Sequence, residues 1–338
     1  MAAAIDTEPH KPATPPAMAN ALWYTRAHTL ELRAEQLPPL APSEAMVETL
    51  YSALSRGTER LVYNGAVPES EWQRMRAPHQ SGNFPFPVKY GYSTAGVVRD
   101  GPPDLIGQSV FCLYPHQDRF HVDTGWLVPV PESIPAKRAT LSANMETALN
   151  AIWDSGAAPA DQIIVIGAGI VGLLVSYLAS RIPGTTVTLV DVAENRESFA
   201  LAMGARFALP ANAPRDADIV FHTSANAAGL RTAMDCAGFE ATIVEMSWYG
   251  SRPVETFLGE SFHANRLRLI SSQVGHVAPS HRARWTHRRR IEAAIGLLDA
   301  PELDCLVADE IQFADAAAKL PRIFANDWPD LPPVIRYT

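Results

Sequence analysis

The stretch that most constrains this chain is an apolar run that ends in glycines and passes directly into a helical pattern. QIIVIGAG begins at Gln162, and IVGLLVSYLASRI follows it from Ile170. A second apolar run, TTVTLVDV, comes next, and a helical segment then ends at Gly204. Three more strand-like runs continue the alternation: ADIVFHTS, EATIVEMS and RLRLISSQV. Strands that alternate with helices predict a doubly wound parallel sheet of the α/β class.

The glycines between the first strand and its helix fit the pattern GxGxxG. Gly167 allows a tight turn, Gly169 lets the backbone approach a pyrophosphate, and Gly172 lets the helix pack closely on the sheet. Ile170 and Val171 complete the turn and open the helix. This context, rather than the glycines alone, predicts a dinucleotide-binding site.

An acidic residue ends the next strand. Asp191 lies 19 positions after Gly172, and a carboxylate there accepts hydrogen bonds from both ribose hydroxyls and repels a 2′-phosphate. NAD(H) is therefore predicted in preference to NADP(H). Arg196 leaves an alternative open, because its side chain could reach the adenosine ribose or a phosphate.

The first third of the chain has a different rhythm. From Ala21 to about Pro131, short apolar segments such as ALWYTR, AMVETLYSAL and SVFCLY are separated by Gly and Pro. This pattern predicts an antiparallel, barrel-like domain. Residues 136–155 then carry apolar residues at four-residue spacing, which predicts a helix that bridges two domains.

The composition of the chain indicates which cell compartment and which partners are expected. The chain has 338 residues, a formal net charge of -8 and three cysteines without a CxxC pair. These features favour a reducing, cytoplasmic setting and disfavour a disulfide framework or a structural zinc lobe. No apolar run suits a membrane span or a signal peptide. The basic stretch HRARWTHRRR, residues 281–290, is interpreted as a solvated helix face, so neither nucleic acid nor membrane is an expected partner.

The chain resembles the medium-chain dehydrogenase/reductase superfamily, the zinc alcohol dehydrogenases and their relatives. The motifs that carry the resemblance, besides the glycine turn and Asp191, are SRGTE from Ser55, NG at Asn64, GYSTAGVV from Gly91 and GQSV from Gly107. The resemblance implies a GroES-like β-barrel catalytic domain and a Rossmann NAD-binding domain. It also implies a homodimer paired through the nucleotide-domain sheet. The expected division is a disordered tail over 1–19, the catalytic domain over 20–140 and 281–338, and the Rossmann domain over 141–280.

The catalytic-zinc pattern of that superfamily is not matched. The family's Cys-Gly-Ser/Thr-Asp is Arg56-Gly57-Thr58-Glu59 here, or begins at Ser55 if slipped by one position. The family's Gly-His-Glu is Gly91-Tyr92-Ser93, and the third ligand position falls near Ala143. A catalytic zinc site needs three protein ligands of the Cys, His or carboxylate type. No bound zinc is therefore expected, although a shifted site that uses His116, His121 or Glu59 remains an alternative.

Without a metal, an acid or base must handle the alcohol proton. Thr58 matches the family's hydroxyl beside the substrate oxygen, and Tyr92 occupies the lost histidine position. Glu146, in the bridging helix, and His276, after the last sheet strand, complete the candidates. Three of the four have a structural alternative: strand-edge packing for Tyr92, a helix-dipole role for Glu146 and a solvated loop for His276.

The resemblance further implies that backbone at Thr223, Ser247 and Gln273 lines the nicotinamide pocket. The resulting expectation is a zinc-independent, NAD(H)-dependent oxidoreductase that acts on an alcohol, a carbonyl or an activated double bond of a small molecule. A secondary alcohol on a larger ring system is a variant, because some zinc-less relatives act in pigment pathways. The alternative is a non-catalytic NAD(H)-binding sensor or partner-binding protein with the same fold.

Overall fold

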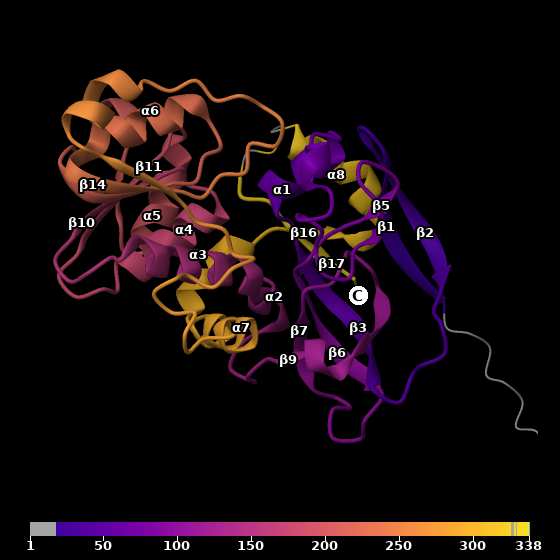
Figure 1. Ribbon diagram of the computed structural model, residues 1–338. Coiled ribbons are helices and arrows are strands. Elements are labelled where there is room, and N and C mark those ends of the chain that lie inside the picture. The colour runs from indigo at the N-terminus through magenta and orange to yellow at the C-terminus, as the bar shows by residue number, and fades with distance from the viewer. Residues whose placement is uncertain (1–17, 326–327, 329, 338) are drawn as a thin grey trace, which may run out of the picture.

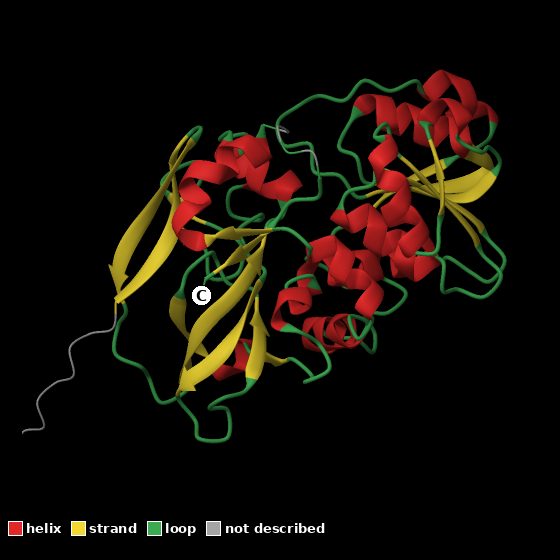
Figure 2. Cartoon of the chain, turned by 180° about the vertical axis from the view of Figure 1, so that it is seen from behind, coloured by secondary structure: helices red, strands yellow, loops and turns green. Residues whose placement is uncertain are grey.

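The computed structural model describes residues 18–325, 328 and 330–337. Two lobes lie side by side (Figure 1). Seen from behind, one lobe consists mainly of curved strands and the other of a sheet flanked by helices (Figure 2). Among the described residues, no helix combines the length and apolar character needed to cross a membrane.

The helix-flanked lobe contains a six-stranded sheet in the order β12-β11-β10-β13-β14-β15. All its strand pairs are parallel. Its strands are β10 (Gln162–Ile166), β11 (Thr186–Val190), β12 (Arg206–Ala208), β13 (Ala217–His222), β14 (Ala237–Glu245) and β15 (Arg268–Ser271). Its helices are α4 (Ile170–Ala179), α5 (Glu197–Ala202) and α6 (Ala227–Cys236), with short turns η3 (Glu194–Arg196), η4 (Pro210–Asn212) and η5 (Leu258–Phe262). The strand order reverses beside β10, so the predicted doubly wound sheet is confirmed, with its crevice at β10 and β13.

The strand-rich lobe contains two sheets, ordered β2-β1-β5-β4 and β16-β17-β3-β6-β7-β9, with β8 also paired to β3. The strands of the first are β1 (Met18–Arg26), β2 (Thr29–Gln36), β4 (Ser81–Gly82) and β5 (Val88–Lys89). Those of the second are β3 (Glu44–Ala53), β6 (Thr94–Asp100), β7 (Ser109–Cys112), β8 (Arg119–Asp123), β9 (Val128–Pro129), β16 (Glu310–Gln312) and β17 (Val334–Arg336). Strands from both ends of the chain thus share one sheet (Figure 1).

The remaining helices surround these sheets. They are α1 (Arg56–Tyr63), α2 (Ala136–Ala139), α3 (Ser142–Ser155), α7 (His287–Gly296) and α8 (Ala316–Phe324), with turns η1 (Glu69–Glu71), η2 (Thr124–Trp126), η6 (Pro301–Val307) and η7 (Phe313–Asp315). Helix α3 packs against α4 on one side and α7 on the other. The largest apolar cluster runs without a break from Phe111 in β7 through Met145 in α3 to Leu173 in α4, each of them buried. Both lobes therefore pack onto the same bridging helix.

The structure differs from the sequence predictions at three places. The expected helix over 136–155 is two helices, because the Thr140 hydroxyl bonds Lys137 O and the Ser142 hydroxyl bonds Ala139 O at the break. The expected tail over 1–19 ends too late, since β1 begins at Met18; residues 1–17 lie outside the described part. Strands β2 and β8, which are rich in charged and exposed residues, have no counterpart among the predicted segments. The division into domains stays a prediction.

Candidate active site

The glycine turn between β10 and α4 has no room for side chains at its first and third glycines. Gly167 has a φ of +109°, and a Cβ atom there would lie 2.9 Å from the Thr223 hydroxyl oxygen. A Cβ atom on Gly172 would lie 1.9 Å from the carbonyl oxygen of Gly167. Gly169 differs, because nothing lies within 4 Å of its would-be Cβ. The turn therefore leaves open space at the one glycine where the pattern requires a close approach of ligand to backbone.

This open space lies at the start of α4, whose N-cap is Gly169. The amides of Ile170, Val171 and Gly172 belong to the first helical turn, where N–H groups have no acceptor within the helix. Such amides, together with the positive end of the helix dipole, bind phosphate groups. The residues present fit the pyrophosphate of a dinucleotide.

Thr223, predicted to line the nicotinamide pocket, supports the turn through its side chain. Its hydroxyl bonds the carbonyl oxygens of Ile166 and Gly167, at 3.0 and 2.9 Å. The end of β13 is thereby attached to the end of β10. Its backbone N–H donates to Ile166 O as well, at 2.9 Å, so both the side chain and the N–H of Thr223 are engaged within the protein.

Asp191 is held at the end of β11 by two backbone amides. Its carboxylate accepts hydrogen bonds from Ala168 N at 2.6 Å and Ala193 N at 2.9 Å. Arg196 is buried nearby at the end of η3. Arg56, on α1 of the other lobe, also lies close, since burial lowers the pKa of its guanidinium, the charges of Arg196 and Arg60 lower it further, and the Asp191 charge raises it. The predicted adenosine end thus combines a carboxylate with guanidinium groups from both lobes.

Two more predicted residues, Ser247 and Gln273, follow the ends of β14 and β15. The Ser247 hydroxyl accepts a hydrogen bond from Ala225 N at 3.0 Å, which joins the loops after β13 and β14. Gln273 is exposed, and its side-chain oxygen accepts from Gly275 N at 2.8 Å. The three strand-end residues therefore follow three adjacent strands at the carboxyl edge of the sheet.

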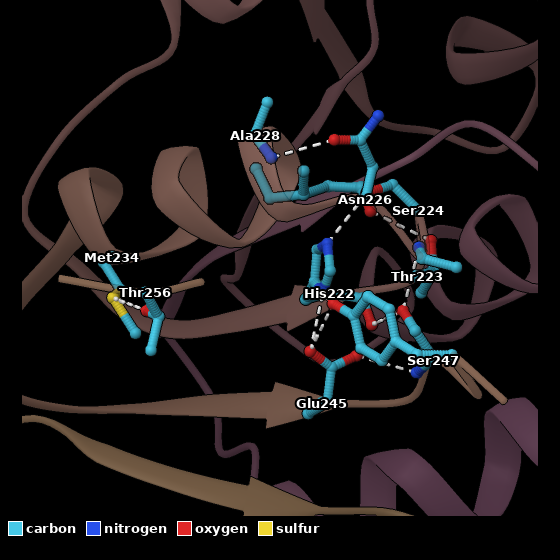
Figure 3. Close-up of polar contacts among 12 residues, drawn as sticks. His222, Thr223, Ser224, Asn226, Ala228, Met234, Glu245, Ser247 and Thr256 are labelled. Atoms are coloured by element: carbon cyan, nitrogen blue, oxygen red, sulfur yellow. Dashed lines mark hydrogen bonds and ion pairs between the residues drawn. The ribbon is translucent and has the colours of Figure 1, made fainter. Parts of the chain in front are cut away.

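A further polar pair, not predicted from the sequence, lies at this same edge: His222 is fully buried and Glu245 is half-buried. His222 and Glu245 are the last residues of β13 and β14 and face each other in the strand register. His222 Nδ1 lies 2.8 Å from Glu245 Oε2, and its Nε2 lies 2.8 Å from the Ser224 hydroxyl (Figure 3). Burial raises the pKa of Glu245, but the hydrogen bond and charge of His222 and the bonds of Ser247 outweigh it, so the pKa is lowered. A polar residue ending each of two apolar runs is a signal that could have revealed this pair.

In the other lobe, the predicted residues Tyr92 and Thr58 come together. Burial raises the pKa of the Tyr92 phenol, while hydrogen bonds with the side chains of Ser55 and Thr58 lower it and the Glu59 charge raises it. Ser55 is the N-cap of α1, and Thr58 lies in its first turn. We call Ser55, Thr58 and Tyr92 the hydroxyl cluster. In the zinc alcohol dehydrogenase pattern, Tyr92 falls at the position of the histidine ligand, Ser55 at that of the thiolate if the match slips by one, and Thr58 at that of the hydroxyl beside the substrate oxygen.

A chain of buried polar groups lies behind the hydroxyl cluster. Glu59 is fully buried and accepts hydrogen bonds from the Tyr24 hydroxyl at 2.8 Å and from Ser55 N at 2.7 Å. His116 Nε2 lies 3.0 Å from the same carboxylate, and its Nδ1 lies 2.7 Å from the Ser52 hydroxyl. A neutral His116 with its proton on Nε2 satisfies every group in this chain. Glu59 therefore holds the start of α1 in place.

Gly91, the residue before Tyr92, is required by this chain. Its φ is +120°, and a Cβ atom there would lie 2.8 Å from Cδ2 of the His116 ring. A side chain at position 91 would displace the imidazole from Glu59. The glycine thus links the placement of Tyr92 to that of the buried carboxylate.

The other two catalytic candidates lie together at a different place, the junction of α3 and α7. Glu146 Oε1 accepts from Arg290 Nε at 2.9 Å, and Arg290 is 1% exposed. The guanidinium also bonds Asn150 Oδ1 at 2.5 Å, His276 O at 3.1 Å and the carbonyl of Val274. The His276 side chain is exposed, and only its backbone joins this group. This geometry favours the structural alternatives for Glu146 and His276.

The donor set at the family's metal position does not fit zinc. Tyr92 and Ser55 offer hydroxyls in place of histidine and thiolate, which are the ligand types that zinc requires. His116 and Glu59 are in contact, but each already bonds other groups, and His121 lies apart on β8 opposite Met46. Nowhere among residues 18–325, 328 and 330–337 do three or more His, Cys, Asp or Glu side chains group in a way that could hold a metal ion.

The two lobes have the architecture of a GroES-like domain joined to a Rossmann domain. Comparisons with known proteins agree. L-idonate 5-dehydrogenase of Escherichia coli superposes with a TM-score of 0.77 at 13% identity, covering 95% of this chain and 99% of that one. A short chain alcohol dehydrogenase of Escherichia coli in complex with NADH gives 0.73 at 14% identity, covering 95% and 99%.

A relative is also found by sequence. D-guloside 3-dehydrogenase of Escherichia coli is 23% identical over 308 residues, which span 81% of this chain and 87% of the relative. No family model matches the chain.

Proposed function

We propose that this protein is an NAD(H)-dependent oxidoreductase that interconverts an alcohol and a carbonyl, or reduces an activated double bond, without zinc. The observation that carries the proposal is the hydroxyl cluster. A phenol, Tyr92, bonded by Ser55 and Thr58, stands at the sequence position where a metal ligand is expected, in a fold with an intact dinucleotide turn. Hydroxyl groups can position and donate a proton, which is the task left when the metal is lost.

The cofactor would be held by the backbone of the glycine turn and by Asp191. Gly169 leaves space for the pyrophosphate, and the amides of Ile170, Val171 and Gly172 would bind it. The carboxylate of Asp191 supports NAD(H) over NADP(H), while Arg196 and Arg56 supply positive charge beside it. Bound nicotinamide supplies the hydride acceptor or donor.

Tyr92 would hold the proton that accompanies the hydride. Because burial raises the pKa of the phenol, Tyr92 keeps its proton at neutral pH and can donate a hydrogen bond to a substrate carbonyl oxygen. Ser55 and Thr58 orient the phenol and offer hydroxyls that can pass the proton on. Glu59, bound by Tyr24 and His116, keeps the first turn of α1 in place without joining the proton transfer.

Secondary alcohols are the substrate class that we propose to test first. Two of the similar proteins are named for oxidation at ring or chain secondary alcohols, D-guloside at position 3 and L-idonate at position 5. Dimerisation through the nucleotide-domain sheet and a cytoplasmic location complete the proposal; the chain's low cysteine content supports the latter.

The test is a turnover screen of protein purified without metal-affinity resin. NAD(H)-dependent activity on a panel of secondary alcohols, glycosides, ketones and enones, unaffected by a chelator and with less than stoichiometric zinc, is the expected result. Stoichiometric zinc together with chelator-sensitive turnover would overturn zinc independence. Tight NADH binding with no turnover on any substrate would instead support a non-catalytic nucleotide-binding protein.

A further inference from the structure

The pair His222–Glu245 belongs to a larger unit that includes Tyr249. The Tyr249 hydroxyl donates to Glu245 Oε2 at 3.2 Å and lies 3.4 Å from His222 Nδ1. The second carboxylate oxygen accepts from Ser247 N at 2.7 Å. We call His222, Glu245 and Tyr249 the strand-end unit. Its carboxylate therefore binds three donors, one from the end of β13 and two from the loop after β14.

This unit holds the loop after β14 against the other lobe. Gly250 follows Tyr249 with a φ of +65°, and a Cβ atom there would lie 2.6 Å from the carbonyl oxygen of Ala66. Ser251 N donates to that same carbonyl at 3.3 Å. Ala66 lies just beyond the end of α1, the helix whose first turn carries Thr58. The loop over 246–252 thus spans from the strand-end unit to the helix of the hydroxyl cluster.

The hydrogen-bonded order Ser224–His222–Glu245 has the spacing of a nucleophile, a base and an acid, yet it is closed to a substrate. His222 is fully buried, and α6 packs directly over the Ser224 hydroxyl. A Cβ atom on Gly229 of that helix would lie 2.2 Å from Ser224 Oγ and 2.9 Å from His222 Nε2. A tetrahedral carbon cannot fit on that side of the oxygen. The arrangement therefore serves to fix groups in place.

The place of the unit on the sheet indicates which half of the cofactor it serves. In a doubly wound sheet the ligand crosses the carboxyl edge at the point where the strand order reverses, here between β10 and β13. Asp191 assigns the adenosine half to the β11 side. The other half then lies toward β13 and β14, where the strand-end unit is located.

We propose that the strand-end unit is a positioning device that sets the affinity for the nicotinamide half of the cofactor. It acts by fixing the loop 246–252, and the inference rests on the proposed NAD(H) function. His222, Glu245 and Tyr249 are positioning residues, since they act through the loop that they hold.

The test compares NADH with ADP-ribose, which lacks the nicotinamide, by isothermal titration calorimetry. Tyr249→Phe removes one hydroxyl from the Glu245 carboxylate and leaves the ring. We expect its Kd for NADH to rise about three- to tenfold, on the scale of one ordinary hydrogen bond, and its Kd for ADP-ribose to stay within about twofold. His222→Gln, measured in the same way, should show the same split.

The matched control is Thr256→Val. Thr256 bonds the Met234 sulfur at 3.3 Å on the same lobe, outside the unit (Figure 3), and its loss should leave both affinities unchanged. Equal weakening of NADH and ADP-ribose in Tyr249→Phe and His222→Gln, or no weakening of either, would overturn the inference and leave the proposed function standing. A wild-type protein that binds neither compound would overturn both.

Discussion

The sequence predicts catalytic residues at two places in this molecule, the α3–α7 junction and the hydroxyl cluster. The two places differ in how many of their polar groups already have hydrogen-bond partners. At the α3–α7 junction, Glu146 meets a guanidinium that also bonds three other oxygens, and both side chains are buried. In the hydroxyl cluster, Tyr92 and Thr58 are half-buried and uncharged, and hydrogen bonds link the Tyr92 phenol to the side chains of Ser55 and Thr58. A saturated ion pair holds structure together, whereas partly exposed hydroxyls retain capacity for a substrate.

The comparison teaches that burial and a shifted pKa do not by themselves mark a catalytic carboxylate. Burial raises the pKa of Glu146, which is the property expected of a general acid, although Arg290 lowers it in opposition. The direction of the shift is the same for Tyr92. What separates the two groups is the partner: a buried guanidinium in one case and small hydroxyls at a lobe boundary in the other.

The largest expected effect is on the junction. Arg290→Met would leave the buried Glu146 carboxylate and three oxygens without their donor, so the free energy of unfolding should fall by about 3–5 kcal/mol. Denaturant unfolding measures it. The control is Arg289→Ala on the same helix, an exposed residue whose guanidinium lies 4.0 Å from the Trp285 ring centroid, where a loss of about 1 kcal/mol or less is expected. Equal losses of unfolding free energy in both variants would contradict a structural role for the Glu146–Arg290 pair.

Tyr92→Phe should change catalysis strongly and stability little, the opposite of what is expected for Arg290→Met. Loss of a positioned proton donor lowers kcat about 100-fold, at the lower end for general acid catalysis, while the free energy of unfolding changes by about 1 kcal/mol or less. Steady-state kinetics on a substrate from the screen, paired with denaturant unfolding, measures both. Tyr63→Phe is the control, because that hydroxyl donates to His28 O, at 3.0 Å, away from the hydroxyl cluster, and its loss should leave kcat unchanged. An unchanged kcat in Tyr92→Phe would remove the proton-donor role.

A smaller effect is expected at Thr58. Thr58→Ala removes one hydroxyl from the cluster and should lower kcat about tenfold, the scale of one hydrogen bond. Thr58→Ser keeps the hydroxyl and should stay within about twofold of wild type. Kinetics of the two variants side by side would contradict the role of the hydroxyl if both fell equally.

The smallest effect concerns the pH dependence of stability at Glu146. Its folded-state pKa is raised above the ordinary 4.5, so between pH 4.5 and the raised value the unfolded chain is ionised while the folded protein keeps the proton. This contribution to stability is complete below pH 4.5 and is lost as pH rises through the folded-state pKa. Glu146→Gln should therefore gain stability relative to wild type as pH rises through that window, by less than about 1.4 kcal/mol per pH unit. If the stability difference between Glu146→Gln and wild type stayed constant or fell as pH rises, the effect of Arg290 on the Glu146 pKa would outweigh that of burial.

Features that depend on short-range order could be predicted from the sequence. The glycine turn and Asp191 are predicted from residues within one strand–helix–strand unit, because the backbone there dictates which side chains fit. The fold class followed from the alternation of strands and helices and is confirmed by the sheet order.

Features that depend on long-range contact were not predictable in this way. Glu146 and Arg290 are 144 positions apart, and no local pattern indicates that an arginine from a basic stretch turns inward. Gln273 and Ser247 could be placed at strand ends, yet which of their atoms are already bonded depends on neighbouring loops. His222 and Glu245 were detectable only as polar residues that end apolar runs.

The polar chain behind the hydroxyl cluster also reaches the far end of the sequence. The Ser52 hydroxyl that contacts His116 lies 2.9 Å from the Tyr337 hydroxyl, and these two residues are 285 positions apart. At typical rates of synthesis, roughly 15 to 60 s separate their emergence from the ribosome. Strand β17, which pairs with β3, becomes available only after the whole helix-flanked lobe has been made. The helix-flanked lobe begins to be synthesised second, yet its fold can be completed first. The strand-rich lobe, which carries Tyr92, can be completed only after strand β17 has been translated.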